Sequence, residues 1–126
     1  MKILIVDDDA DIRLIASIAL ASDEIEIIEA QTGLQALSVA EKVRPDVILL
    51  DMMMPNMDGK TTFSKLRQLP NLADVPVIYL TAKVQAAEID AYIKSGVAGV
   101  ITKPFDPMTL PEEIAEILTV ASKGNR

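Results

Sequence analysis

Five short apolar segments, separated by longer stretches with helical spacing, constrain the fold of this chain more than any other feature. Each is rich in Ile, Val or Leu and is bounded by polar, Gly or Pro residues, which is typical of buried strands. The segments are Ile3–Val6, Ile25–Ile28, Val47–Leu50, Val75–Leu80 and Val97–Ile101. Such alternation favours an α/β fold, in which right-handed helical crossovers join the parallel strands of a five-stranded sheet and cover both of its faces.

The intervening stretches predict five helices. The first is expected to bury a face that contains Ile12, Ile15 and Ile18. The 126 residues match the size of one domain, and half of them are apolar, which is enough for a core without disulfides. We expect residues 1–121 to form this domain and residues 122–126 to form a frayed C-terminal tail.

The composition excludes several kinds of site. The chain has no cysteine and no histidine, so disulfides and sites that need a thiolate or an imidazole are ruled out. Nineteen acidic residues against twelve basic ones, with two tyrosines and two phenylalanines, argue against direct binding of nucleic acid. No segment has the length of a membrane span or the pattern of a signal peptide. We therefore expect a cytoplasmic protein that does not insert into a membrane.

Polar side chains follow the expected strands at the points where these strands end. Asp7, Asp8 and Asp9 follow the first strand, Asp51 the third, Thr81 the fourth and Lys103 the fifth. The carboxyl ends of parallel strands share one edge, and ligands bind there at the point where the strand order reverses. With an assumed strand order of 2-1-3-4-5, that point lies between the first and third strands, so Asp7, Asp8 and Asp51 flank it.

This set of side chains suits phosphoryl transfer. Carboxylates that converge repel one another and need a cation, and oxygen ligands favour a hard divalent ion. Mg²⁺ fits best because it uses one or two carboxylates and keeps waters or phosphate oxygens as its other ligands, and Mn²⁺ is a possible substitute. Lys103 can pair with a carboxylate and a phosphate, and Thr81 can donate its hydroxyl to a phosphate oxygen.

The same segments resemble the receiver domain of two-component response regulators over nearly the whole chain. The matching segments are Ile3–Asp9, Val47–Pro55, Met57–Gly59, Val77–Ala82 and Gly99–Phe105. The resemblance implies a flavodoxin-like (βα)5 three-layer sandwich. It also implies a phosphorylation-switched signalling module of a phosphorelay, which is not an enzyme beyond catalysing its own phosphorylation and dephosphorylation.

By this resemblance, Asp51 is the phospho-acceptor, and a histidine kinase or a small phosphodonor supplies the phosphoryl group. Asp7 and Asp8 would hold Mg²⁺, with Asp8 and Asp51 as direct ligands and Asp7 acting largely through water. The backbone carbonyl of Met53 would be the third protein ligand.

The resemblance also assigns the residues that bind the phosphoryl group. Thr81 and Lys103 would bind it and sense its arrival, and Pro104 would follow a cis peptide bond that aims the Lys103 side chain at the site. Further phosphate contacts are expected from the backbone N–H groups of Met52, Met53 and Ala82.

Two further positions bear on output and on the lifetime of the phosphate. The family often has Tyr or Phe three residues before its strand-5 lysine, where this chain has Val100. We expect Val100 to mute or reroute output through the face formed by the fourth helix, fifth strand and fifth helix. Positions equivalent to Met53 and Lys83 gate water access in the family, so the apolar Met53 predicts a fairly long-lived phosphate.

The resemblance implies a sensor histidine kinase or phosphotransfer protein as donor, an unidentified protein target and, as one option, a homodimer through the fourth and fifth helices. Two alternatives stay open. One is a phosphatase similar to the haloacid-dehalogenase superfamily that uses Asp7 and Asp9, although Asp9 and Asp11 are better explained as acids that begin the first helix. The other is a receiver-like interaction module that is not phosphorylated. A dinucleotide-binding domain is excluded because no glycine-rich loop follows the first strand.

Overall fold

Five parallel strands form one sheet in the order β2-β1-β3-β4-β5, as predicted. The structure is a computed structural model that describes residues 1–82 and 84–124, so the gating role expected for Lys83 lies outside the described residues. The strands are β1 (Lys2–Val6), β2 (Glu26–Ala30), β3 (Val47–Asp51), β4 (Val77–Thr81) and β5 (Gly99–Thr102). Every strand is parallel to its neighbours, so all five carboxyl ends lie along one edge of the sheet.

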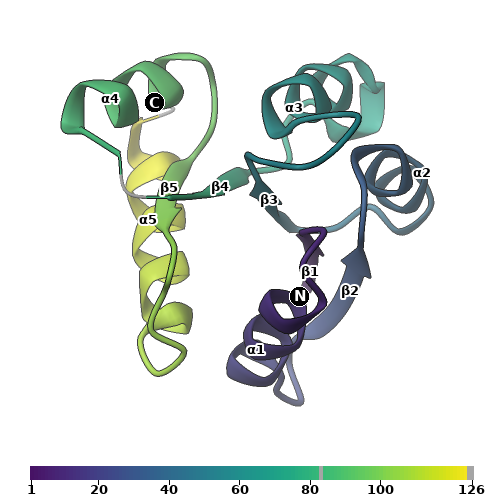
Figure 1. Cartoon of the computed structure of the whole chain (residues 1–126), viewed down its shortest axis with the longest axis vertical. Helices are drawn as coiled ribbons and strands as arrows, with labels where there is room; N and C mark the ends of the chain where they lie inside the picture. Colours follow the sequence, from purple (N-terminus) through teal and green to yellow (C-terminus); the bar gives the residue numbers. More distant parts are fainter. Residues whose placement is uncertain (83, 125–126) are drawn as a thin grey trace.

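Helices cover both faces of this sheet, which gives the three layers of a flavodoxin-like fold (Figure 1). The helices are α1 (Ala10–Leu20), α2 (Gly33–Val43), α3 (Gly59–Gln68), α4 (Ala86–Lys94) and α5 (Leu110–Gly124), with a short 3₁₀ helix, η1 (Pro70–Leu72). One apolar core lies between the sheet and helices α1 and α5, and the other lies beneath α2, α3 and α4. Both predictions, the fold class and the strand order, are confirmed.

The central strands carry most of the burial. All residues of β3 and β4 are buried, as expected for parallel strands that are covered on both faces. Helix α4 is the opposite case, because none of its residues is buried. No helix within residues 1–82 and 84–124 is long and apolar enough to cross a membrane.

The buried face of α1 differs from the predicted one. Ile15 is 40% exposed and Ile18 is 70% exposed, whereas Arg13, Ala16 and Leu20 face inward. Ala16 is fully buried on the side of α1 that packs on the sheet. The guanidinium of Arg13 is held on the same side by hydrogen bonds to Glu29 and to the carbonyl of Asp7. These contacts set the orientation of the helix, so Ile15 and Ile18 face outward.

The C-terminal helix extends into the segment that was expected to form a frayed tail. Pro111 lies in the first turn of α5, where a missing N–H group costs nothing. The helix continues through Gly124, three residues into the segment that was expected to be frayed, because no proline or glycine interrupts it before that point. Asn125 and Arg126 lie outside the described residues.

Candidate functional site

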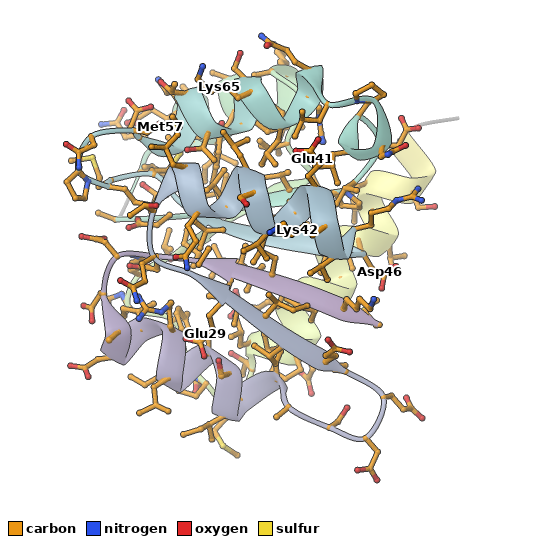
Figure 2. All side chains as sticks on the ribbon, turned by 90° about the vertical axis from the view of Figure 1, so that its right-hand side faces the viewer. Glu29, Glu41, Lys42, Asp46, Met57 and Lys65 are labelled. Atoms are coloured by element: carbon orange, nitrogen blue, oxygen red, sulfur yellow. The ribbon has the colours of Figure 1, made fainter. Side chains whose placement is uncertain are left out.

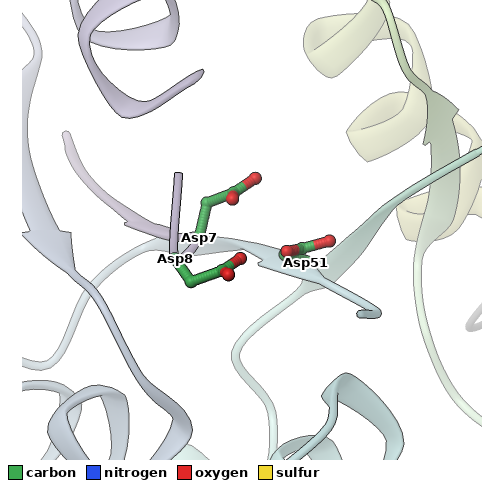
Figure 3. Close-up of side chains that lie close together, drawn as sticks. All are labelled: Asp7, Asp8 and Asp51. Carbon is green, nitrogen blue, oxygen red and sulfur yellow. The ribbon is translucent and has the colours of Figure 1, made fainter. Parts of the chain in front are cut away.

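An open cavity of about 280 Å³ lies at the carboxyl edge of the sheet. The residues that line it are Asp7, Asp8, Asp9, Asp51, Met53, Ala82 and Lys103. Figure 3 shows Asp7 and Asp8 at the end of β1 beside Asp51 at the end of β3. The structure thus brings together most of the residues that the sequence placed at this edge. Thr81 lies buried at the end of β4 next to Ala82, and Val100 lies within β5, where it packs on the core beneath α4.

The three carboxylates converge closely enough that they could hold one metal ion. Asp7, Asp8 and Asp51 each offer an oxygen, and these oxygens all lie within 4.8 Å of one another. Since Mg–O bonds are close to 2.1 Å, ligands of one Mg²⁺ lie at most about 4.2 Å apart. Small side-chain movements therefore suffice, and the all-oxygen donor set fits a hard divalent cation.

Lys103 links two of these carboxylates. Its Nζ donates to Asp7 Oδ2 at 2.6 Å and to Asp51 Oδ1 at 3.0 Å. The side chain of Asp7 is fully buried and that of Asp51 is 4% exposed, so water contributes little to their solvation. The peptide bond between Lys103 and Pro104 is cis.

The electrostatics of the cavity follow from this burial. Burial raises the pKa of Asp51 to about 6, the negative charge of Asp7 adds to the shift, and the hydrogen bond from Lys103 opposes it. Burial by itself would lower the pKa of Lys103, but its hydrogen bonds to Asp7 and Asp51 outweigh this effect, and the pKa is raised. Lys103 therefore stays a cation while Asp51 is largely ionised at pH 7.

The backbone N–H groups near Asp51 have different partners. The N–H of Met52 donates to the carbonyl of Leu80 at 3.0 Å and extends the β3–β4 pairing, so a phosphate contact from this group would require that bond to break. The N–H of Met53 points to Asp51 Oδ1 at 3.2 Å, where a phosphoryl group on Asp51 would lie. The side chain of Met53 is 78% exposed, whereas Met52 and Met54 are buried.

Asp9 has a structural role. Its carboxylate accepts hydrogen bonds from the N–H groups of Asp11 at 2.9 Å and Ile12 at 3.4 Å, which makes it the N-cap of α1. This confirms the prediction that Asp9 begins the helix. It also weakens the phosphatase alternative, which requires Asp9 as a catalytic group.

Two residues near the site were not identified from the sequence as part of it. Gly59 lies at the start of α3 directly against the backbone of Asp51 and Met52. Arg13 was not considered at all, although its guanidinium donates to the carbonyl of Asp7. The signal for Arg13 was a single arginine one helical turn after the aspartates, with Glu29 near the end of the second strand.

Replacing Gly59 with Ala is expected to destabilise the protein and to displace Asp51. A Cβ atom at Gly59 would lie 2.6 Å from the carbonyl oxygen of Asp51 and 2.7 Å from Cα of Met52. Because both are backbone atoms, the strand end or α3 has to move, at a cost of about 1–3 kcal/mol. Urea unfolding will measure this cost. An unchanged midpoint would show that α3 is not held against β3.

Comparisons with known proteins agree with this geometry. The family model described as "Response regulator receiver domain" matches residues 3–115. Chemotaxis response regulator CheY4 of Vibrio cholerae is similar in structure, with a TM-score of 0.85 and 32% identity over 92% of this chain and 97% of that chain.

Longer curated proteins also match. The DNA-binding dual master transcriptional regulator RpaA of Synechocystis sp. is 34% identical over 99% of this chain and 51% of its own length. Response regulator PleD of Caulobacter vibrioides is 38% identical over 86% of this chain and 24% of its own length. The chain thus spans about half or less of the length of these relatives. With the match over residues 3–115 and this fold, it belongs to the response regulator receiver domains of two-component signalling.

Proposed function

We propose that this receiver domain is a phosphorylation switch that accepts a phosphoryl group on Asp51. The proposal rests on the cavity that contains Asp51. In this cavity Asp7 and Asp8 lie beside Asp51, and the ammonium group of Lys103 donates a hydrogen bond to Asp51. The donor is a phosphohistidine of a sensor kinase or phosphotransfer protein, or a small molecule such as acetyl phosphate.

In the proposed reaction, an oxygen of Asp51 forms a bond to phosphorus while the bond from phosphorus to the donor breaks. At pH 7 most Asp51 is ionised and nucleophilic, because its pKa is about 6. Lys103 contacts Oδ1 of Asp51 and offsets the charge of the incoming oxygens, and the N–H of Met53 supplies a further donor. The domain catalyses only its own phosphorylation and dephosphorylation.

Mg²⁺, or Mn²⁺ in its place, would supply positive charge between the carboxylates and the phosphoryl oxygens. We propose Asp8, Asp51 and the carbonyl of Met53 as its ligands, with Asp7 acting through water. The oxygens of Asp7, Asp8 and Asp51 that converge within 4.8 Å support this set.

Output is proposed to begin at Thr81 and Lys103, which end neighbouring strands at this edge. Val100 pairs with Tyr79 across β4 and β5, and Tyr79 packs edge-to-face on Tyr92 of α4, with ring centroids 5.4 Å apart. The aromatic side chain that contacts Tyr92 of α4 is therefore Tyr79 of β4, and β5 offers the aliphatic Val100 at the paired position. This supports the proposal that Val100 mutes or reroutes output through α4, β5 and α5, the face also proposed for a homodimer.

Incubation with Mg²⁺ and acetyl phosphate, followed by intact mass measurement, tests this function. We expect one phosphoryl adduct that is stable for long enough to detect and that requires Mg²⁺. No adduct from acetyl phosphate or from a panel of histidine kinases would favour an interaction module that is not phosphorylated. Steady release of phosphate from phosphate esters would instead favour the phosphatase.

The outward face of α1 is proposed to dock the phosphodonor protein. Leu14, Ile15 and Ile18 are 57%, 40% and 70% exposed on a helix whose N-cap, Asp9, lines the cavity. Apolar side chains gathered in this way are typical of protein interfaces. Because Asp9 and Asp51 line the same cavity, we propose that a donor docked there brings its phosphohistidine close to Asp51.

Replacing Ile15 and Ile18 with Ser is expected to slow phosphotransfer from a kinase about tenfold or more, because buried apolar contacts in a complex are lost. The rate with acetyl phosphate should stay unchanged, since neither residue lines the cavity. Leu34→Ser is the matched control, because Leu34 is 67% exposed on α2. Equal losses in the control and the α1 variant would place the docking face elsewhere.

A further inference from the structure

Arg13 is a buried cation behind the acidic cavity. It projects from α1 and is 9% exposed. Its Nη1 donates to the backbone carbonyl of Asp7 at 2.7 Å, and its Nε donates to Oε1 of Glu29 at 3.0 Å. Glu29 lies near the carboxyl end of β2, beside α1 (Figure 2). Arg13 thus links α1 both to the carboxylate of Glu29 in β2 and to the backbone carbonyl of Asp7, which directly follows β1.

That carbonyl belongs to the peptide that connects Asp7 with Asp8. The other polar groups of Asp7 are also engaged: its N–H donates to the carbonyl of Ala30 at 3.2 Å, and its carboxylate accepts from Lys103 and from the N–H of Asp9 at 2.9 Å. Asp8, by contrast, is exposed. The direction in which the exposed carboxylate of Asp8 leaves the backbone therefore depends on the peptide that Arg13 holds.

We propose that Arg13, oriented by Glu29, is a positioning residue for the divalent-cation site and acts through the Asp7–Asp8 peptide. The proposal rests on the proposed function, because it assumes that Asp7, Asp8 and Asp51 bind Mg²⁺. Groups that orient metal ligands without touching the metal commonly change its affinity by about 10- to 100-fold.

The charge of Arg13 and its hydrogen bonds act on metal affinity in opposite directions. A buried positive charge repels a divalent cation, so removing the charge alone would tighten Mg²⁺ binding. Removing the hydrogen bond to Asp7 frees the Asp7–Asp8 peptide and weakens binding, because the three oxygens no longer converge. The sign of the change therefore separates positioning from simple electrostatics.

The test measures Mg²⁺ affinity by calorimetry without a phosphodonor, together with thermal unfolding, in the full chain. Arg13→Gln is expected to bind Mg²⁺ about tenfold more weakly than the wild type. Arg13→Lys keeps the charge but cannot make both hydrogen bonds, so its Mg²⁺ affinity should lie between those of the wild type and Arg13→Gln. It also serves as the folded variant if Arg13→Gln does not fold.

Arg67→Gln is the matched control. Arg67 is half-buried and donates to the carbonyls of Leu72 at 3.1 Å and Val75 at 2.8 Å, before the start of β4 and thus at the opposite edge of the sheet. This variant should unfold at a lower temperature than the wild type. Its Mg²⁺ affinity should stay within about twofold of the wild-type value, because a distant charge is screened.

Unchanged or tighter Mg²⁺ binding by both Arg13 variants would overturn the proposal, as would an equal loss in Arg67→Gln. If the wild type itself does not bind Mg²⁺, the metal step of the proposed function fails, and the role of Arg13 fails with it. If the wild type binds Mg²⁺ and is phosphorylated while the Arg13 variants match it, only the role of Arg13 is refuted.

Discussion

Replacing Asp51 with Asn is expected to abolish phosphorylation and to raise the free energy of unfolding of the metal-free protein at pH 7 by about 2–3 kcal/mol. In the proposed reaction the carboxylate is the attacking group, and the Asn amide cannot replace it. The gain in stability arises because Asp51 is buried, which raises its pKa from 3.8 to about 6. Ionising Asp51 at pH 7 therefore destabilises the folded protein, and Asn, which does not ionise, avoids this cost.

The gain should depend on pH in a defined direction. The folded protein binds the proton of Asp51 more tightly than the unfolded chain does, so this group adds stability below its unfolded pKa of 3.8. That contribution is lost as the pH rises through about 6. The advantage of Asn should therefore be close to zero near pH 4 and complete by pH 7.

Urea unfolding of both proteins at several pH values, in the presence of a chelator, measures the stability difference. Intact mass measurement detects the phosphoryl adduct. Added Mg²⁺ should stabilise the wild type more than Asp51→Asn, because the variant lacks one of the proposed metal ligands. An adduct that persists in Asp51→Asn would refute the assignment of the acceptor. A variant that is less stable than the wild type at pH 7 would refute the electrostatic argument.

Replacing Lys103 with Met is expected to slow phosphorylation by acetyl phosphate at pH 7 at least about tenfold, because a cation at the developing charge is lost. Without the hydrogen bond from Lys103, the pKa of Asp51 rises further above its usual range. The rate should therefore rise with pH, with a midpoint above that of the wild type under the same conditions.

The same replacement should destabilise the metal-free protein, because breaking a buried ion pair costs about 3–5 kcal/mol when one charge stays behind. Met keeps much of the apolar stem, so the loss reports the ammonium group. Lys42→Met on α2 is the control: Lys42 is exposed and should affect neither rate nor stability. An unshifted pH profile in Lys103→Met would show that Lys103 does not set the ionisation of Asp51.

The strands were predictable from the sequence, because apolar runs such as Val47–Leu50 are typical of strands in a sheet that is covered on both faces. Their order was assumed, and the structure confirms it. The edge strand β2 was less certain. It was predicted at Ile25–Ile28 and is observed at Glu26–Ala30, because Glu29 interrupts the apolar run but still pairs opposite Ile5. The orientation of α1 was not predictable, because its aliphatic residues occur around most of its circumference.

For the site, topology alone placed Asp7, Asp51 and Lys103 at one edge. It did not reveal which hydrogen bonds are already made. The N–H of Met52 is engaged by Leu80, and the carbonyl of Asp7 is engaged by Arg13. Such contacts join residues far apart in the chain, so no local pattern reports them. The ionisation of Asp51 depends on the same contacts and on burial, and it follows only from the structure.

The absence of any buried residue in α4 affects the free energy needed to move this helix. An α4 that shifts gives up little apolar burial, so its alternative positions differ little in free energy. One charge-assisted hydrogen bond gained at Thr81 contributes about 1.5–3 kcal/mol, which changes the ratio of two populations by a factor of about ten or more. If the proposed phosphorylation takes place, a single phosphoryl group is therefore enough to select a position of α4 while the all-buried strands β3 and β4 stay in place.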